Sequence, residues 1–163
     1  MKTAIERSSL KSVMKNLNKE IKGIENRTLM GLIDGVYIIR RAVDLESPKV
    51  PVGETGNLRA SWSTVTSKGM VAGDSGTAFT GDDASQMTSQ HASVVEENKA
   101  AAARSKNPIA IFGFSALYAA PVHENYGAHF KRPGAGAGYL VSAINSHEKD
   151  IFETIRENAK VKK

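Results

Sequence analysis

A stripe of apolar residues near the N-terminus constrains the fold of this chain more than any other feature. The positions of this stripe recur every three or four residues, at Leu10, Val13, Leu17, Ile21, Ile24, Thr28, Leu32, Val36, Ile39 and Val43, and Thr28 is the one that is not apolar. This spacing places apolar side chains on one face of an α-helix, and most of the intervening charged residues fall off that face. The sequence therefore predicts an amphipathic helix from Leu10 to about Val43, which Pro48 and Pro51 keep from continuing much beyond Leu45.

A helix of this length is longer than the domain that carries it. It would extend roughly 50 Å at about 1.5 Å per residue, whereas a domain of this size is roughly 30 Å across. Part of the helix must then contact a neighbouring subunit, or the helix must break. We expect any bend or break between Gly23 and Gly35, because each of Gly23, Gly31 and Gly35 costs roughly 0.5–1 kcal/mol relative to alanine.

The rest of the chain predicts short strands and a second long helix. Leu58 to Thr66 alternates as a half-buried strand does, and further strands are expected at 70–72 and 108–114. A short helical turn is expected within 117–124, and a final helix over 139–159. The predicted fold class is α+β: a long N-terminal helix and a C-terminal helix packed on a small antiparallel sheet, in one domain spanning 1–163.

Residues 73–107 differ in composition from the segments around them. Their first part is rich in Gly, Asp, Ser and Thr, which is typical of a loop, and residues 89–105 contain good helix formers with little apolar periodicity. A helix there would bury little. We therefore expect an insertion that is mobile or contacts a partner. Residues 160–163 end the chain as a basic tail.

Composition excludes several classes of protein. The chain has no cysteine, so disulfides and thiolate metal sites are excluded. No window approaches the roughly 20 apolar residues of a membrane span, and Met1 to Lys11 lacks a signal-peptide core. We expect a soluble protein made in a cytoplasm, with no membrane partner. The net charge of +5 is dispersed and lacks the basic and aromatic run of single-strand binders.

Three arrangements that could carry chemistry are incomplete. Gly134 to Gly138 precedes a helix but lacks the ending of a phosphate-binding loop. His123, Glu124 and His129 do not fit a zinc pattern, because Gly127 stands where a second histidine is needed. No serine lies in a nucleophile elbow. We therefore predict no catalytic residue, no metal and no cofactor, and a protein that is not an enzyme.

Two further stretches, VPVGETGNLRASW at 50–62 and LYAAPVHENYG at 117–127, carry a family resemblance. The first meets the pattern P-x-x-T-G-x-L-x-x-S, with one extra residue, at Pro51, Thr55, Gly56, Leu58 and Ser61. The second meets Y-A-x-x-x-E-x-G, with a residue or two inserted, at Tyr118, Ala119, Glu124 and Gly127. Together with the loop that contains Pro133 and leads into the last helix, these stretches resemble the tail-completion, or neck, family of head–tail joining proteins in tailed bacteriophages.

The resemblance implies a structural virion protein located in the neck or tail. Copies of the chain would form a ring, plausibly of six, between the portal assembly and the tail tube. The implied partners are other copies and the neighbouring neck and tail proteins: adaptor or stopper, tail terminator or tail tube. DNA would pass through the lumen without sequence-specific binding. The long helix and a sheet edge would bind neighbouring copies, while loops 49–57, 73–107 and 125–138 would reach adjacent rings.

The motif residues also have expected roles of their own. The Thr55 hydroxyl can close a turn and Gly56 permits a positive φ, so that Leu58 then anchors the strand. Arg59, on the opposite strand face, is expected to pair with a carboxylate, for which Glu124 is a candidate.

Other residues of the two stretches are expected to pack. Tyr118, Val122 and Tyr126 are spaced to pack one side of a short helix. Trp62, the only tryptophan, is expected to pack beneath the long helix.

Two other functions remain open at the level of sequence. The chain could be a nucleic-acid-binding accessory protein that uses basic residues on the first and last helices. It could also be a small hydrolase, which would require His123 and Glu124 to converge with a serine in a pocket.

Overall fold

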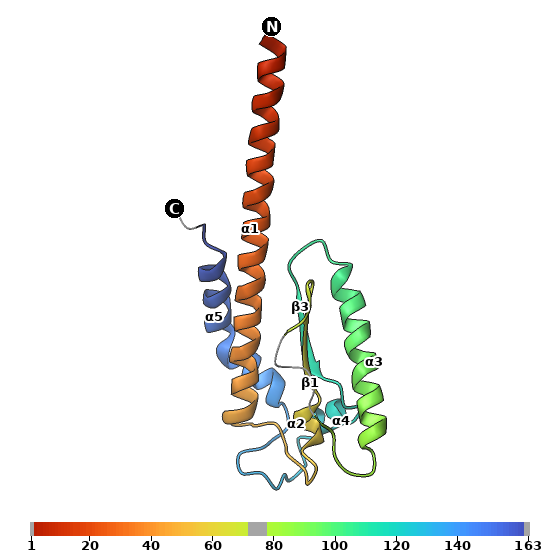
Figure 1. The fold of residues 1–163 in the computed structure, drawn as a ribbon. Coiled ribbons are helices and arrows are strands. Elements are labelled where there is room, and N and C mark those ends of the chain that lie inside the picture. The colour runs from red at the N-terminus through yellow and green to blue at the C-terminus, as the bar shows by residue number, and fades with distance from the viewer. Residues whose placement is uncertain (1, 72–77, 162–163) are drawn as a thin grey trace.

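The computed structural model describes residues 2–71 and 78–161, with side chains described from Leu10 onward. Helices and a three-stranded antiparallel sheet form one body, from which the first helix projects (Figure 1). The elements in chain order are α1 (Lys2–Leu45), α2 (Asn57–Ala60), β1 (Trp62–Thr66), β2 (Gly69–Met70), α3 (Ala84–Ala103), β3 (Ala110–Phe114), α4 (Ala119–Glu124) and α5 (Tyr139–Ala159). The predicted α+β class is confirmed.

α1 is one continuous helix of 44 residues that begins earlier than the sequence pattern indicates. It does not break between Gly23 and Gly35. α5 lies against the lower half of α1, and a Cβ atom at Gly31 would stand only 2.8 Å from the Ile155 Cα atom. A Cβ at Gly35 would stand 3.1 Å from Ile151 Cγ2. These two glycines therefore let the helices approach closely, and this packing offsets their low helix propensity.

The sheet has the strand order β2-β1-β3, and β1 pairs with β3 from Trp62 opposite Phe114 to Thr66 opposite Ala110. α1 and α5 lie on one side of the sheet and α3 on the other (Figure 1). All five residues of β1 are buried, because helices cover both faces. The alternation predicted for this strand therefore does not correspond to one buried and one exposed face.

The strand predicted from Leu58 begins only at Trp62, because Asn57 to Ala60 form the short helix α2. Gly56, with φ of 68°, turns the chain into this helix. The Ser61 hydroxyl donates a hydrogen bond to the Leu58 carbonyl at 2.8 Å and closes the helical turn. Leu58 is nevertheless buried, as its anchoring role requires, but it lies on a helix.

The expectation that a helix within 73–107 would bury little is wrong. α3 packs on the sheet and buries Met87, Val95 and Ala102. Val95 and Ala102 form a second core with Val65 of β1. The buried positions recur at helical spacing, but one of them is alanine, so the apolar signal is weak. The insertion is expected to span 73–107 and to be mobile or to contact a partner, and its residues 73–77 lie outside the described residues.

Most of the remaining predictions of secondary structure are confirmed. β3 lies within its predicted strand, α4 forms the predicted short turn, and α5 has the predicted bounds. β2 begins one residue before the strand predicted at 70–72, because Gly69 already pairs with Thr66, and it ends at Met70. The main core lies between α1, α5 and the sheet and includes Val43, Trp62 and Tyr139. Among the described residues, no helix is both long and apolar enough to cross a membrane.

Candidate assembly surfaces

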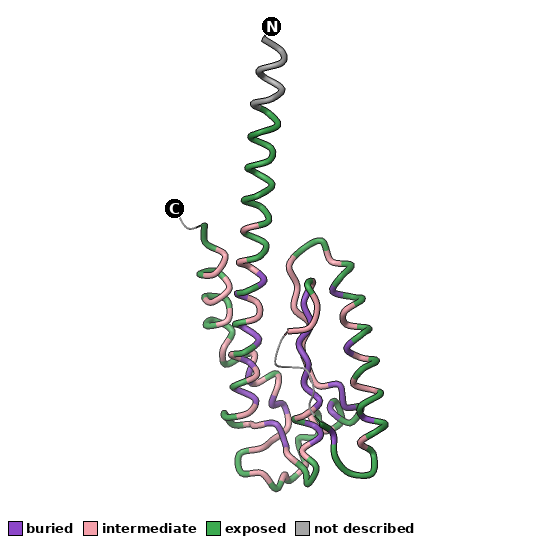
Figure 2. Tube along the Cα trace, viewed as in Figure 1, coloured by how far each residue is buried: buried purple, intermediate pink, exposed green. Residues whose placement is uncertain are grey.

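The N-terminal half of α1 extends beyond the domain, and its described residues from Leu10 onward are largely exposed (Figure 2). This half carries an open apolar stripe. We define the α1 stripe as its six exposed large apolar residues: Leu10, Val13, Met14, Leu17, Ile21 and Ile24. Leu10 is 63% exposed and Ile24 is 38% exposed, and the first described residue of α1 that is buried is Leu29. The stripe spans roughly 20 Å of helix at about 1.5 Å per residue. The domain itself therefore leaves this apolar face uncovered.

The spacing of the α1 stripe suits packing against another helix. Leu10, Met14, Leu17, Ile21 and Ile24 are separated by alternating steps of four and three residues. This is the heptad pattern of a helix–helix seam, in which side chains of one helix fit between those of a partner. The stripe is therefore suited to one further helix or to a similarly shaped apolar groove.

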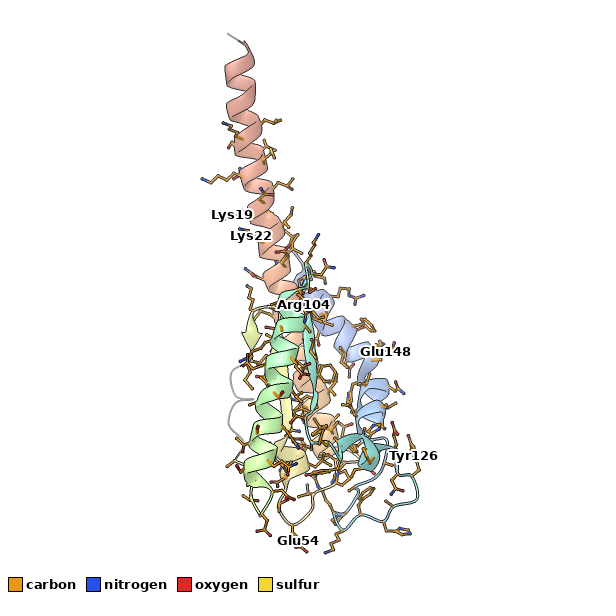
Figure 3. All side chains as sticks on the ribbon, turned by 90° about the vertical axis from the view of Figure 1, so that its right-hand side faces the viewer. Lys19, Lys22, Glu54, Arg104, Tyr126 and Glu148 are labelled. Carbon is orange, nitrogen blue, oxygen red and sulfur yellow. The ribbon has the colours of Figure 1, made fainter. Side chains whose placement is uncertain are left out.

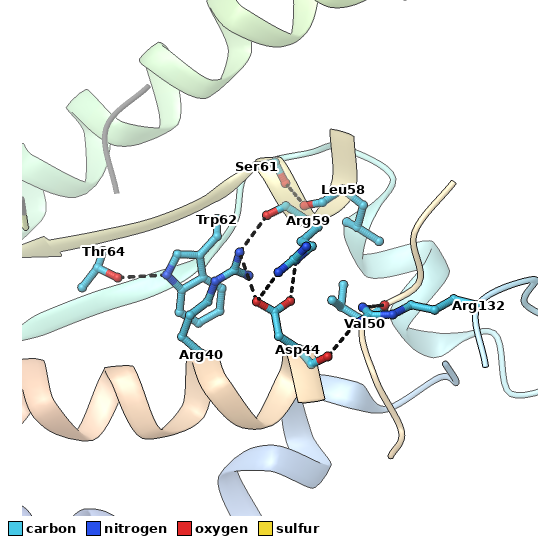
Figure 4. Close-up of polar contacts among 9 residues, drawn as sticks. All are labelled: Arg40, Asp44, Val50, Leu58, Arg59, Ser61, Trp62, Thr64 and Arg132. Carbon is cyan, nitrogen blue, oxygen red and sulfur yellow. Dashed lines mark hydrogen bonds and ion pairs between the residues drawn. The ribbon is translucent and has the colours of Figure 1, made fainter. Parts of the chain in front are cut away.

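The first motif stretch lies at the C-terminal end of α1, where Arg59 pairs with Asp44 (Figure 4). Arg59 Nε donates to Asp44 Oδ1 at 2.8 Å, and a second guanidinium nitrogen donates to Oδ2 at 3.2 Å. The hydrogen bond with Asp44 raises the pKa of Arg59. The predicted pairing with Glu124 is wrong, because α2 directs Arg59 toward the end of α1.

Trp62 packs beneath α1, as predicted. The Arg40 guanidinium of α1 lies 5.1 Å from the centre of the Trp62 ring, in a cation–π arrangement (Figure 4). Arg40 also donates to the Arg59 carbonyl at 3.2 Å. The indole nitrogen donates to Thr64 Oγ1 at 3.1 Å, so the polar part of the buried side chain is satisfied.

Arg132 joins the late loop to the end of α1, a role that the sequence patterns did not indicate. Its two terminal nitrogens donate to the Val50 carbonyl at 2.9 Å and to the Asp44 carbonyl at 2.6 Å (Figure 4). The Lys49 amide donates to the Gly134 carbonyl at 2.8 Å on the other side of Pro133. In the sequence, the signal for this role of Arg132 is its position directly before Pro133 in the expected loop.

The turn of the first motif forms largely as predicted. The Asn57 amide donates to Thr55 Oγ1 at 3.4 Å, and Gly56 has the expected positive φ. Asn57 was not predicted as a site residue, although it is buried. Its side-chain amide donates to the Thr80 carbonyl at 2.8 Å, and its oxygen accepts from the Thr80 amide at 3.0 Å. Asn57 therefore fixes the motif turn to the segment that leads into α3.

The two motif stretches meet at a groove of about 410 Å³. Pro51, Thr55 and Leu58 from the first stretch line it together with Tyr118 and Val122 from the second. The remaining lining residues are Val52, Gly53, Glu54, Asn57, His129, Phe130 and Lys131. The fold thus brings together residues that lie about 60 positions apart in the sequence.

The other residues of the second stretch lie elsewhere. Ala119 is buried, and its carbonyl accepts a hydrogen bond from the Tyr139 hydroxyl at 3.4 Å. Burial raises the pKa of Tyr139 to about 12. Glu124 and Gly127 are exposed, and Tyr126 is 77% exposed. Tyr126 does not continue the side formed by Tyr118 and Val122, because α4 ends at Glu124.

The histidines take part in contacts between elements. His123 Nε2 accepts a hydrogen bond from the Val141 amide at 3.5 Å, and its ring packs against Tyr139. His91 Nδ1 lies 2.7 Å from Ser115 Oγ, and this hydroxyl donates to the Ser61 carbonyl at 3.1 Å. In that arrangement His91 donates to the serine, which is opposite to what activates a nucleophile. Burial lowers the pKa of His91.

The described residues contain no group of three metal-ligating side chains placed to hold an ion. Comparison of the chain with protein-family models, with curated proteins and with solved structures finds no match. The resemblance to the neck family therefore depends on the two motif stretches.

Proposed function

We propose that this chain is a structural virion protein of the phage neck, whose copies form a ring that joins or completes the tail at the head–tail interface. The observation that carries the proposal is the α1 stripe, which the domain leaves open. The meeting of the two motif stretches in one groove supports it as well. In the ring, α1 packs its lower half on its own domain and its upper half on a neighbouring copy.

The size of the stripe indicates how such copies assemble. Its six side chains are roughly half exposed, so complete burial stabilises each by about 1 kcal/mol, or roughly 6 kcal/mol in all. Association costs at least about 4 kcal/mol in lost translational and rotational freedom. One stripe alone therefore supports weak pairing, whereas a closed ring gives every copy two interfaces. Assembly should accordingly require high concentration or a template.

A ring requires two different surfaces on each copy, one that docks and one that receives. The α1 stripe is the first surface. A candidate for the second is the outer edge of β3, because β3 pairs only with β1 among the described strands and its other edge can bind a further segment. The loops 49–57 and 125–138, which form the groove, lie at the opposite end of the domain from the projecting part of α1 (Figure 1). They are placed to contact an adjacent ring.

The proposal is tested by removing the gene from the phage that encodes it. We expect DNA-filled heads and separate tails, with joining restored when the wild-type chain is supplied in trans. A chain with Leu17→Asp and Ile21→Asp should fold but fail to restore joining. The matched control carries Ser12→Asp and Asn16→Asp, which add the same charge to another side of α1. Normal joining without the gene, or restoration by the stripe variant, would contradict the proposal.

A further inference from the structure

A second face of the projecting helix is strongly basic. We define the lysine face as Lys11, Lys15, Lys19 and Lys22. At about 100° per residue these side chains centre roughly 140° around the helix from the α1 stripe. All four are exposed, and they border one open hollow together with Asn18, Asn26, Gly23 and Met14 of the α1 stripe. No ion pair involves any of them among the described side chains.

The basic surface continues onto the end of the domain. Lys68, in the turn between β1 and β2, donates a hydrogen bond to the Asn26 side chain of α1. Asn26, Lys68 and Lys106 border the next hollow along the surface. Figure 3 shows Lys19 and Lys22 projecting from α1 beyond the end of the domain where Arg104 lies. Among the residues that line the two hollows, Glu25 is acidic, whereas six are lysines. The surface is therefore predominantly positive.

We propose that the lysine face, together with Lys68 and Lys106, binds the phosphate backbone of double-stranded DNA without reading its sequence. The lysines repeat about every 6 Å along α1, and lysine ammonium groups bind phosphates as point charges. A duplex is favoured over a single strand because the face has no aromatic side chains on which bases could stack. A helix that lies on a bilayer also carries its lysines on the face opposite its apolar residues, so the test includes vesicles as well as a duplex.

The lysine face lies mostly apart from the proposed assembly interface, and Met14 is the stripe residue that borders the same hollow. The α1 stripe can be covered by a neighbouring copy while the lysine face stays open to DNA. In a neck ring the lysine face would suit the wall of the DNA channel. This placement rests on the proposed function, whereas duplex binding by the lysine face does not.

The test measures binding of the full chain to a fluorescent random-sequence duplex by polarisation, from about 50 to 200 mM salt. Wild-type binding should weaken steeply as salt rises. The variant Lys11→Gln, Lys15→Gln, Lys19→Gln and Lys22→Gln should bind at least about tenfold more weakly. Its slope of log affinity against log salt should be shallower by up to about 3.6, since each of the four phosphate contacts contributes about 0.9.

The control variant carries Lys131→Gln, Lys149→Gln, Arg156→Gln and Lys160→Gln, which remove the same charge from exposed residues elsewhere. It should bind the duplex as the wild type does. Equal losses in the two variants, or no wild-type binding at low salt, would overturn the inference. Binding to phosphatidylserine vesicles but not to the duplex would also overturn it. Sedimentation of the lysine-face variant should show unchanged assembly. If the variant lost assembly together with duplex binding, the binding would be assigned to the α1 stripe instead.

Discussion

At the scale of single residues, two glycines set the distance between α1 and α5. A Cβ at Gly31 would stand 2.8 Å from the Ile155 Cα and 3.0 Å from the Asn158 Cβ. Backbone cannot yield as the end of a flexible side chain can, so the two helices would have to separate. Gly23 differs, because its nearest neighbour is the far end of the Arg27 side chain, at 3.3 Å, and not backbone.

Gly31→Ala should therefore destabilise the protein by about 1–3 kcal/mol, despite the higher helix propensity of alanine. Gly23→Ala is the matched control and should leave the stability of the domain unchanged or slightly raised. Urea unfolding followed by circular dichroism measures both. Equal stability of the Gly31→Ala variant and the wild type would show that the helices are not in close contact.

Arg132 is the residue whose removal should most weaken the loop that leads into α5. Arg132→Ala loses two hydrogen bonds from a charged group to carbonyls, each worth about 1.5–3 kcal/mol in favourable cases. We expect a loss of about 2 kcal/mol in thermal or urea unfolding. Arg132→Lys should recover only part of it, because one ammonium cannot reproduce the planar fork. Full recovery by lysine would mean that charge alone matters here.

His147 should make stability depend on pH. Its Nε2 lies 2.8 Å from Glu46 Oε2, and this hydrogen bond, helped by Asp150, raises the pKa of His147. A group whose pKa is raised by folding stabilises the protein fully below its unfolded pKa, about 6.5. That contribution is lost as pH rises through the higher folded value.

His147→Gln should thus reduce stability in acid and bring it close to wild type in mild alkali, as measured by urea unfolding at several pH values. His91→Gln is an informative contrast. Because burial lowers the pKa of His91, protonation of this residue in acid costs the wild type stability. His91→Gln should remove that loss. A parallel pH dependence of wild type and His147→Gln would refute the role assigned to the Glu46 contact.

At the scale of elements, periodicity over many residues predicts well and short segments predict poorly. The α1 and α5 patterns repeat over several turns, so both helices are recognisable in the sequence. Leu58 to Ala60 alternate like a strand, but Gly56 and the Ser61 hydroxyl bond enforce a helical turn. Arg59 consequently reaches Asp44, a partner that no local pattern indicates. α3 buries an alanine against Val65, and a methyl group contributes little to an apolar pattern.

The projecting part of α1 should be dispensable for folding of the domain. Because Leu29 is the first described residue of α1 that is buried, a chain that starts at Gly23 should keep its cooperative unfolding and nearly the same melting temperature. It should lose the capacity to assemble, because the α1 stripe is removed apart from Ile24. Circular dichroism and sedimentation measure the two properties. A molten domain after truncation would mean that residues before Gly23 contribute to the core.

At the scale of the whole molecule, the fold combines a packed domain with a helix that extends beyond it. The predicted excess length of α1 is confirmed, and of the two alternatives left open by the sequence, the break is absent. The sequence could not indicate this outcome, since the close approach of α5 to Gly31 and Gly35 depends on a contact more than 100 residues away. The groove likewise exists only because the fold unites two distant stretches. Both features leave open surfaces on the described part of the chain.

The most direct test of the proposed assembly is electron cryomicroscopy of particles of the phage that encodes this chain. The account predicts a closed ring in the neck into which this fold fits, with the upper half of each α1 packed on a neighbouring copy and Leu17 and Ile21 buried. Absence of the chain from the particles would contradict the account. So would a ring in which the α1 stripe remains open to solvent.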